Sequence, residues 1–174
     1  MGNNYDNWTN KMMTHILPTR KPNRLQGYNY SSNGVYFITI CTAQKRCTLS
    51  EIRVGADIIR PPVVSLTDLG RLTDDAIRNI PKHYKGVGVD KYVIMPNHIH
   101  LLLRLENDSG RMVSAPTVIG SLKRFVSKTA NHSVWQKGFY DRVVRSEEEY
   151  IRKWEYIDSN PSQWLLKKDE YYFD

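Results

Sequence analysis

The pattern of apolar positions predicts a strand-rich centre. Residues 35–42 are β-branched and aromatic on both faces, which is typical of a central strand. Residues 87–95 and 98–105 predict two further strands, joined antiparallel through a tight turn at Pro96 and Asn97. The odd positions of the later strand are all apolar and predict the face packed on the core, because each buried Leu or Ile contributes about 2 kcal/mol.

Helical spacing predicts a first helix between the first two of these strands. Apolar side chains recur at intervals of three and four over 66–80, where Ser65 or Thr67 could cap the start and Pro81 is expected to end the helix. The segment 43–65 lacks this period and contains two prolines that exclude an inner strand. It predicts a loop excursion that could include an edge hairpin.

Two more helices and one strand follow. Residues 118–129 have helical spacing and are entered through Pro116. Residues 139–145 predict a fourth strand at a sheet edge. A capping-box pattern at 146–149 opens a third helix, which is expected to end at Asn160 because a proline follows it.

The order of these elements predicts an α+β fold. Strand, helix, strand, strand, helix, strand is the ferredoxin-like βαββαβ arrangement, an antiparallel sheet with helices on one face and the other face open. The third helix is an addition at the C-terminal end. We expect this domain over 34–165, with an N-terminal arm over 1–33 and a tail over 166–174.

Composition narrows the class of protein. The 174 residues include 25 Lys and Arg against 18 Asp and Glu, and this charge of +7 favours a polyanionic partner such as nucleic acid. Cys41 and Cys47 fit neither a disulfide framework nor a zinc pair. No signal peptide and no run near the roughly eighteen apolar residues of a membrane span occur, so we expect a soluble cytoplasmic protein.

Two groups of basic residues could contact a polyanion. The arm either orders on a nucleic-acid backbone or is a plain flexible leader. Basic residues of the second helix lie off its apolar stripe, as a solvated face or a phosphate-contact surface. The residues concerned are Arg20, Lys21 and Arg24 in the arm and Lys123, Arg124 and Lys128 in the helix.

Two histidines share the face opposite the core face of their strand. His98 and His100 are two residues apart, so their side chains project together. Such a pair can bind one divalent metal, or both can be ordinary half-buried histidines, and an isolated pair favours the second interpretation.

The third helix places a tyrosine off its buried stripe. Tyr150, Trp154 and Ile157 form that stripe, and Tyr156 and Asn160 lie about 100° away from it, facing one direction together because they are four apart. Tyr156 could be an ordinary surface aromatic, and Asn160 could simply stop the helix.

Several motifs in one order and spacing resemble the HUH single-tyrosine transposases, and among them the REP-associated tyrosine transposases. The motifs are Met95-Pro-Asn-His-Ile-His100, Val134-Trp-Gln-Lys-Gly-Phe-Tyr-Asp141 and Tyr156-Ile-Asp-Ser-Asn-Pro161. Residues 28–31 and 34–42 are similar to the opening of the family as well. The resemblance covers roughly residues 20–165.

The resemblance implies a set of roles. His98, His100 and Asn160 would bind Mg²⁺ or Mn²⁺, and Tyr156 would be the nucleophile of a DNA endonuclease and transposase. Single-stranded DNA beside hairpin-forming palindromes would be cut and rejoined through a 5′-phosphotyrosine intermediate, by a monomer or a homodimer. By affinity alone, nitrogen ligands favour manganese or zinc. Relatives often have His where this chain has Arg142, to which we assign no catalytic part.

Other functions fit parts of the pattern. A non-cleaving protein that binds nucleic-acid hairpins, derived from such a transposase, would keep the fold but would not need the whole set of site residues. A metal-dependent hydrolase of small phosphoesters or a histidine-triad enzyme is a further alternative, although the triad enzymes have a third alternating histidine where Leu102 stands.

Lys153, one turn before Tyr156, is a candidate DNA contact whose charge could assist ionisation of the tyrosine.

Overall fold

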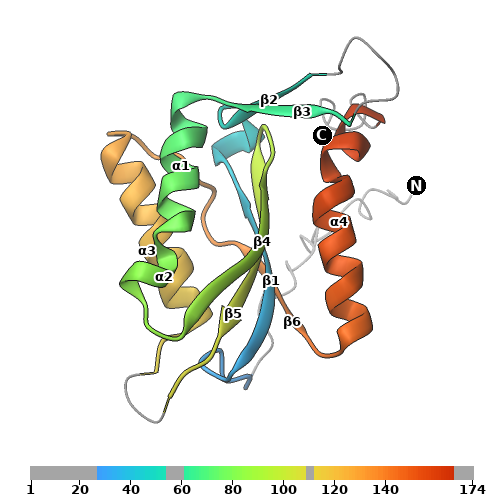
Figure 1. Cartoon of the computed structure of the whole chain (residues 1–174). Coiled ribbons are helices and arrows are strands. Elements are labelled where there is room, and N and C mark those ends of the chain that lie inside the picture. Colours follow the sequence, from blue (N-terminus) through green and yellow to red (C-terminus); the bar gives the residue numbers. More distant parts are fainter. Residues whose placement is uncertain (1–26, 54–60, 109–111, 167–174) are drawn as a thin grey trace, which may run out of the picture.

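In the computed structural model an antiparallel sheet lies between two layers of helices (Figure 1). The structure describes residues 27–53, 61–108 and 112–166. In chain order the elements are β1 (Gly34–Cys41), a short 3-10 helix η1 (Ala43–Lys45), β2 (Ser50–Arg53), β3 (Val63–Leu66), α1 (Asp68–Arg78), α2 (Ile80–His83), β4 (Val87–Ile94), β5 (His98–Leu105), α3 (Ala115–Thr129), β6 (Tyr140–Val144) and α4 (Glu147–Leu166).

The sheet has the topology that the sequence predicts. Its order is β4-β5-β1-β6, with every neighbouring pair antiparallel, and α1 with α2 and α3 forms the layer on one face. The ferredoxin-like βαββαβ fold is therefore confirmed. The excursion between β1 and α1 does contain a hairpin, but β2 and β3 form a separate two-stranded sheet and do not extend an edge of the main sheet. None of the helices in the described parts of the chain combines the length and apolarity needed to cross a membrane.

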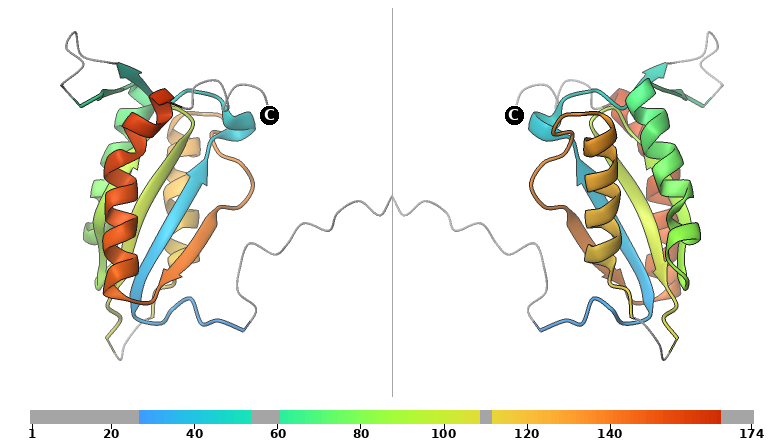
Figure 2. Two further views of the ribbon diagram at one scale, coloured as in Figure 1. Left: turned by 90° about the vertical axis from the view of Figure 1, so that its right-hand side faces the viewer. Right: turned by 90° about the vertical axis from the view of Figure 1, so that its left-hand side faces the viewer.

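The alternation along β5 divides the interior into two apolar clusters. Ile99, Leu101, Leu103 and Leu105 are fully buried in the main core with residues of α1 and α3, as predicted. On the other face Leu102 is equally buried, in a small cluster with Phe37 and Ile157 of α4. The expectation of an open sheet face is therefore corrected, because α4 packs over β4 and β5 and leaves only part of the face uncovered (Figure 2).

Two prolines do not end helices where the sequence suggests. Pro161 lies inside α4, which continues to Leu166, although a proline removes one helical hydrogen bond. Burial of Trp164 in the added turn accompanies this continuation. Pro81 lies in the first turn of α2, where its missing N–H is tolerated, and α1 has already ended at Arg78.

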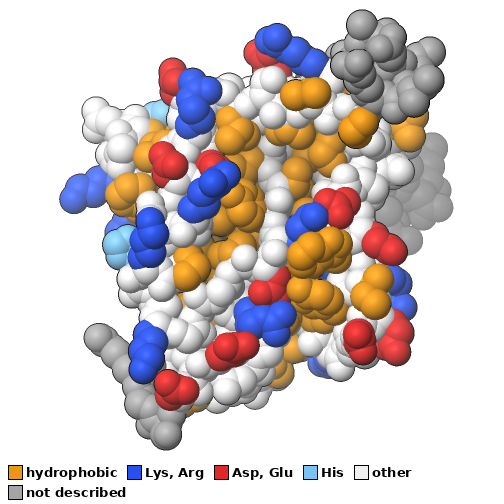
Figure 3. Space-filling model, in the orientation of Figure 1, with side chains coloured by type: hydrophobic (Ala, Val, Ile, Leu, Met, Phe, Trp, Pro, Cys, Tyr) orange, Lys and Arg blue, Asp and Glu red, His pale blue; other side chains and the backbone are white. Residues whose placement is uncertain are grey.

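Helix α4 is joined to β4 by a few specific contacts. Tyr150 donates a hydrogen bond to Asp90 at 3.1 Å, and Lys91 pairs with Asp158 at 2.5 Å. The ammonium of Lys91 also lies 4.6 Å from the centroid of the Trp154 ring. Figure 3 shows hydrophobic side chains along the seam between the sheet and α4, with basic and acidic ones beside them. The predicted stripe of α4 is thus its contact face.

Other local predictions concern the helix caps. The Thr67 hydroxyl accepts a hydrogen bond from the Gly70 amide at 3.0 Å, so Thr67 rather than Ser65 caps α1. Ser114 caps α3 in the same way, and Pro116 lies in the first turn. At the start of α4 the Ser146 hydroxyl accepts from the Glu149 amide at 3.2 Å, in agreement with the capping-box pattern.

Replacement of Gly70 by alanine is expected to destabilise the fold. A Cβ at this position would lie 1.9 Å from the Leu49 carbonyl oxygen, so backbone would have to move. We expect Gly70→Ala to lower the free energy of unfolding by about 2 kcal/mol or more. Gly120→Ala in α3, where a Cβ meets nothing within 4 Å, should raise it by up to about 1 kcal/mol. Urea denaturation of both variants tests this, and equal losses would contradict it.

Candidate active site

The two histidines of β5 lie side by side beneath α4. Their ring centroids are 4.6 Å apart, and His98 and His100 are only 8% and 5% exposed. Each ring is held at Nδ1 by a neighbouring side chain. The Asn97 amide oxygen lies 2.6 Å from His98 Nδ1, and the Thr39 hydroxyl lies 2.9 Å from His100 Nδ1. These partners favour leaving the Nε2 atoms of both rings available to other groups.

Helix α4 brings the predicted tyrosine and asparagine to these rings. The Tyr156 hydroxyl lies 3.5 Å from His100 Nε2, and its ring is edge-on to His100 with centroids 5.1 Å apart. Asn160 is buried and forms a side-chain hydrogen bond with His98. All four residues come together within one chain, although Tyr156 remains 43% exposed.

A tryptophan not foreseen from the sequence completes this side of α4. Trp164 is buried, and its ring centroid lies 5.9 Å from that of His98. It follows Asn160 by four residues, as Asn160 follows Tyr156, so three side chains at one helical spacing face the histidines. The spacing was visible in the sequence, but the expected helix end at Asn160 hid it.

The environment keeps both imidazoles neutral. Burial lowers the pKa of His98 to about 4, against a smaller raising effect of its hydrogen bond with Asn160. Burial also lowers the pKa of His100 to about 2, and the nearby His98 ring and the charge of Lys153 add to this effect. Neutral imidazole is the form that ligates a metal ion.

The donor set fits one divalent ion. The described residues contain no cluster of three or more His, Cys, Asp or Glu side chains, so a third protein ligand here would be the amide oxygen of Asn160. Two neutral nitrogens and one amide oxygen would leave the ion its full charge and open positions. The hydrogen bonds at both Nδ1 atoms are of the kind that orients histidine ligands in metal sites.

Lys153 lies next to this group but not in it. Its ammonium is 4.5 Å from the centroid of the Phe37 ring and 5.6 Å from that of the Tyr156 ring. Burial, and then the charge of Arg142, lowers the pKa of Lys153. The sequence placed Lys153 one turn before Tyr156, and the structure places its charge over the same aromatic pair.

Comparisons with known proteins place this geometry in context. An uncharacterized protein of Haemophilus influenzae is 33% identical over 178 aligned residues, which cover 89% of this chain and 94% of that protein. The two belong to one family. Among solved structures, a REP-associated tyrosine transposase bound to a REP hairpin covers 78% of this chain and 71% of its own, with a TM-score of 0.57 and 18% identity.

This chain has the tyrosine transposase fold. A candidate transposase of Deinococcus radiodurans also matches over 78% of this chain and 95% of its own, with a TM-score of 0.46 and 16% identity. No family model matches the chain.

On this transposase fold the predicted basic contacts have different surroundings. The Lys123 ammonium donates to the carbonyls of Gln136 at 2.8 Å and Gly138 at 2.5 Å, so it holds the segment before β6. Arg124 and Lys128 are exposed. With Lys123 they line a groove at the C-terminal end of α3, on the sheet face away from α4. The predicted contacts Arg20, Lys21 and Arg24 lie outside the described residues.

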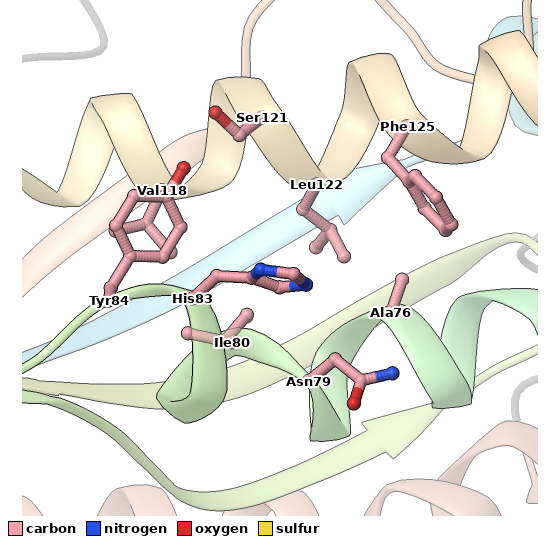
Figure 4. Close-up of a pocket in the computed structure, with 9 residues that line it drawn as sticks. All are labelled: Ala76, Asn79, Ile80, His83, Tyr84, Val118, Ser121, Leu122 and Phe125. Carbon is pink, nitrogen blue, oxygen red and sulfur yellow. The ribbon is translucent and has the colours of Figure 1, made fainter.

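A second hollow of the transposase fold is distant from the histidines. A cavity of about 300 Å³ lies on the face opposite α4, with α1 and α2 on one side of it and α3 on the other. Figure 4 shows the His83 ring lying between Ile80 and Leu122 of α3, with Phe125 at one end. It contains none of the predicted site residues, so it is not the candidate active site.

Proposed function

We propose that the protein is a metal-dependent DNA transposase that cleaves and rejoins single-stranded DNA next to hairpins through a covalent 5′-phosphotyrosine intermediate. One observation carries this proposal, on a chain with the tyrosine transposase fold. The Tyr156 hydroxyl lies 3.5 Å from His100 Nε2 in a site that also holds His98 and Asn160. This arrangement places a candidate nucleophile, the phenol of Tyr156, next to a candidate set of metal ligands.

Each residue of the site has a part in the proposed reaction. The phenolic oxygen of Tyr156 forms the new bond to phosphorus, and the 3′-oxygen leaves with the bonding electrons and takes up a proton. The phenolic proton passes to water, because Tyr156 is 43% exposed. His98, His100 and Asn160 would hold Mg²⁺ or Mn²⁺, which when bound neutralises charge on the non-bridging oxygens. Lys153 would add positive charge beside the tyrosine ring.

The same geometry supports rejoining of strands. A phosphotyrosine bond conserves the energy of the phosphodiester, so a 3′-hydroxyl can attack it and release the tyrosine without ATP. Hairpins are proposed as partners because the REP-associated transposase structure contains one. The exposed cations Arg124 and Lys128 line a basic groove that could contact a hairpin backbone.

The proposal is tested with the full chain and single-stranded oligonucleotides from the DNA that flanks its gene. Mg²⁺ or Mn²⁺ is supplied, EDTA replaces it in a parallel reaction, and products are separated on a denaturing gel and weighed by mass spectrometry. A metal-dependent covalent protein–DNA species supports the proposal. Tight hairpin binding without any adduct would favour the non-cleaving alternative, and metal-dependent cutting without an adduct would favour a hydrolase.

The hydroxyl of Thr39 is expected to tune metal binding without touching the ion. Thr39→Val removes the partner of His100 Nδ1 and keeps the shape of the side chain. Loss of such a partner typically weakens metal affinity about 10- to 100-fold. Titration with Mn²⁺ followed by electron paramagnetic resonance measures this, and Thr39→Ser, which keeps the hydroxyl, serves as control. Equal affinity of the two variants would contradict the expectation.

A further inference from the structure

The uncovered part of the sheet face carries an exposed tyrosine in line with the histidines. In the antiparallel registers Tyr140 of β6 is opposite Thr39, and Thr39 is opposite His100. Directly opposite residues project from the same face, so these three form one row across three strands. Neighbouring strands lie about 4.8 Å apart, which places the backbones of Tyr140 and His100 about 10 Å apart.

Tyr140 is more accessible than its neighbours in this row. It is 47% exposed, whereas Thr39 is half-buried and His100 is 5% exposed beneath α4. Figure 2 shows β6 beside α4 and not under it. An aromatic side chain at this position is not needed for the core, and its ring is available to a flat partner that approaches beside Tyr156.

Positive charge lies along the same strip. Arg142, two residues further on β6, is opposite Phe37 and interacts with the Tyr140 hydroxyl. Lys153 lies over the Phe37 ring from α4. Glu149 is the carboxylate among these residues, and it accepts a hydrogen bond from Arg142 Nε at 2.5 Å. The strip therefore combines an exposed ring with two cations against one anion.

We propose that Tyr140 is a stacking platform for an unpaired nucleobase of the DNA strand, close to the phosphate that reacts at Tyr156, with Arg142 and Lys153 beside the backbone of that strand. The inference rests on the proposed function and deepens it by assigning where the single strand is held. Proteins that bind single strands without sequence preference use exposed aromatic rings flanked by basic side chains, because every base has a π-face that can stack on a ring. Duplex DNA offers no unstacked base to such a ring.

The test uses the full chain with Tyr156→Phe as reference, in EDTA, so that no DNA is cut. Binding of fluorescein-labelled dT16 is measured by anisotropy for the reference and for three further substitutions in it. Tyr140→Leu is expected to weaken binding roughly 5- to 100-fold, the range that loss of one base stack produces. Tyr140→Phe, which keeps the ring, is expected to bind within about twofold of the reference.

A matched control and a direct contact measurement complete the test. Phe125 of α3 is 53% exposed on the opposite face, so Phe125→Leu should bind as the reference does. In the reference chain, dT16 with 5-iododeoxyuridine should crosslink on irradiation to Tyr140, found in the tryptic peptide 138–142. This crosslink decides the matter even if Tyr140→Leu does not fold.

Unchanged affinity of a folded Tyr140→Leu chain, with crosslinks elsewhere, would overturn the inference. Because the binding assay involves neither metal nor cleavage, its result can be interpreted independently of the test of the proposed function. An adduct at Tyr156 with no role for Tyr140 in binding defeats this inference alone. Loss of dT16 binding in Tyr140→Leu supports it even if no adduct forms.

Discussion

A Tyr156→Phe chain is expected to bind single-stranded DNA as the parent does and to form no covalent adduct with it. Phenylalanine keeps the ring that contacts Phe37 and His100 but has no oxygen to attack phosphorus. Stability should change by less than about 0.5 kcal/mol, because the lost hydroxyl lies on a partly exposed side chain. A denaturing gel of parent and variant with Mg²⁺ or Mn²⁺ measures the adduct, and thermal denaturation checks the fold.

Tyr150→Phe is the matched control for this experiment. Tyr150 lies on the same helix, and its hydroxyl donates a hydrogen bond to Asp90 instead of facing the histidines. This variant should keep the adduct at a level within a few-fold of the parent. An adduct that persists in Tyr156→Phe would mean another nucleophile, and metal-dependent cleavage that persists without an adduct would mean that water is the nucleophile.

Removal of one histidine is expected to have the second largest effect. His100→Ala deletes one of the two candidate nitrogen ligands, and we expect Mn²⁺ affinity to fall by roughly 100-fold or more, beyond the loss from a partner of a ligand. Metal-dependent adduct formation should become undetectable at metal concentrations that saturate the parent. Calorimetric titration with Mn²⁺ and the gel assay measure the two effects.

The control for the histidine variant is an exposed histidine elsewhere. His83→Ala lies on α2, on the opposite face, and should leave metal binding and adduct formation unchanged. His100→Ala also opens space beside Phe37, whose ring stacks on that of His100 with the two centroids 5.3 Å apart. His100→Leu fills that space without supplying a ligand atom, and its unfolding by urea shows whether the fold survives. Parent-like Mn²⁺ affinity in a folded His100→Leu chain would contradict the assignment.

The parts of the fold that follow local periodicity could be predicted from the sequence. The alternation in β5 gave the core face correctly, since the odd positions are apolar over the whole strand. The order of elements then left few topologies for a sheet of this size. The predicted helix ends at Pro161 and Pro81 were wrong. At Pro161 the tendency of proline to end a helix is outweighed by packing of the following turn, and Pro81 lies in a first turn, where proline is tolerated.

The residues of the candidate site could be predicted from the sequence, but the contacts that hold neighbouring side chains in place could not. His98 with His100, and Tyr156 with Asn160, share faces because of spacing within one strand and one helix. Thr39 reaches His100 only through the pairing of β1 with β5, a register that no local pattern shows. Along its helix Lys123 has the spacing of a free surface charge, but its carbonyl partners lie beyond the end of that helix, 13 and 15 residues later in the chain.

One feature of α4 would couple two steps of the proposed reaction. Tyr156 and Asn160 stand one turn apart on the same continuous helix, and Asn160 meets His98 while Tyr156 meets His100. On the proposed function, a displacement of this helix would withdraw the proposed metal ligand Asn160 and the proposed nucleophile Tyr156 together. In that reaction, metal binding and attack on DNA would both depend on one structural variable, the packing of α4 on β4 and β5.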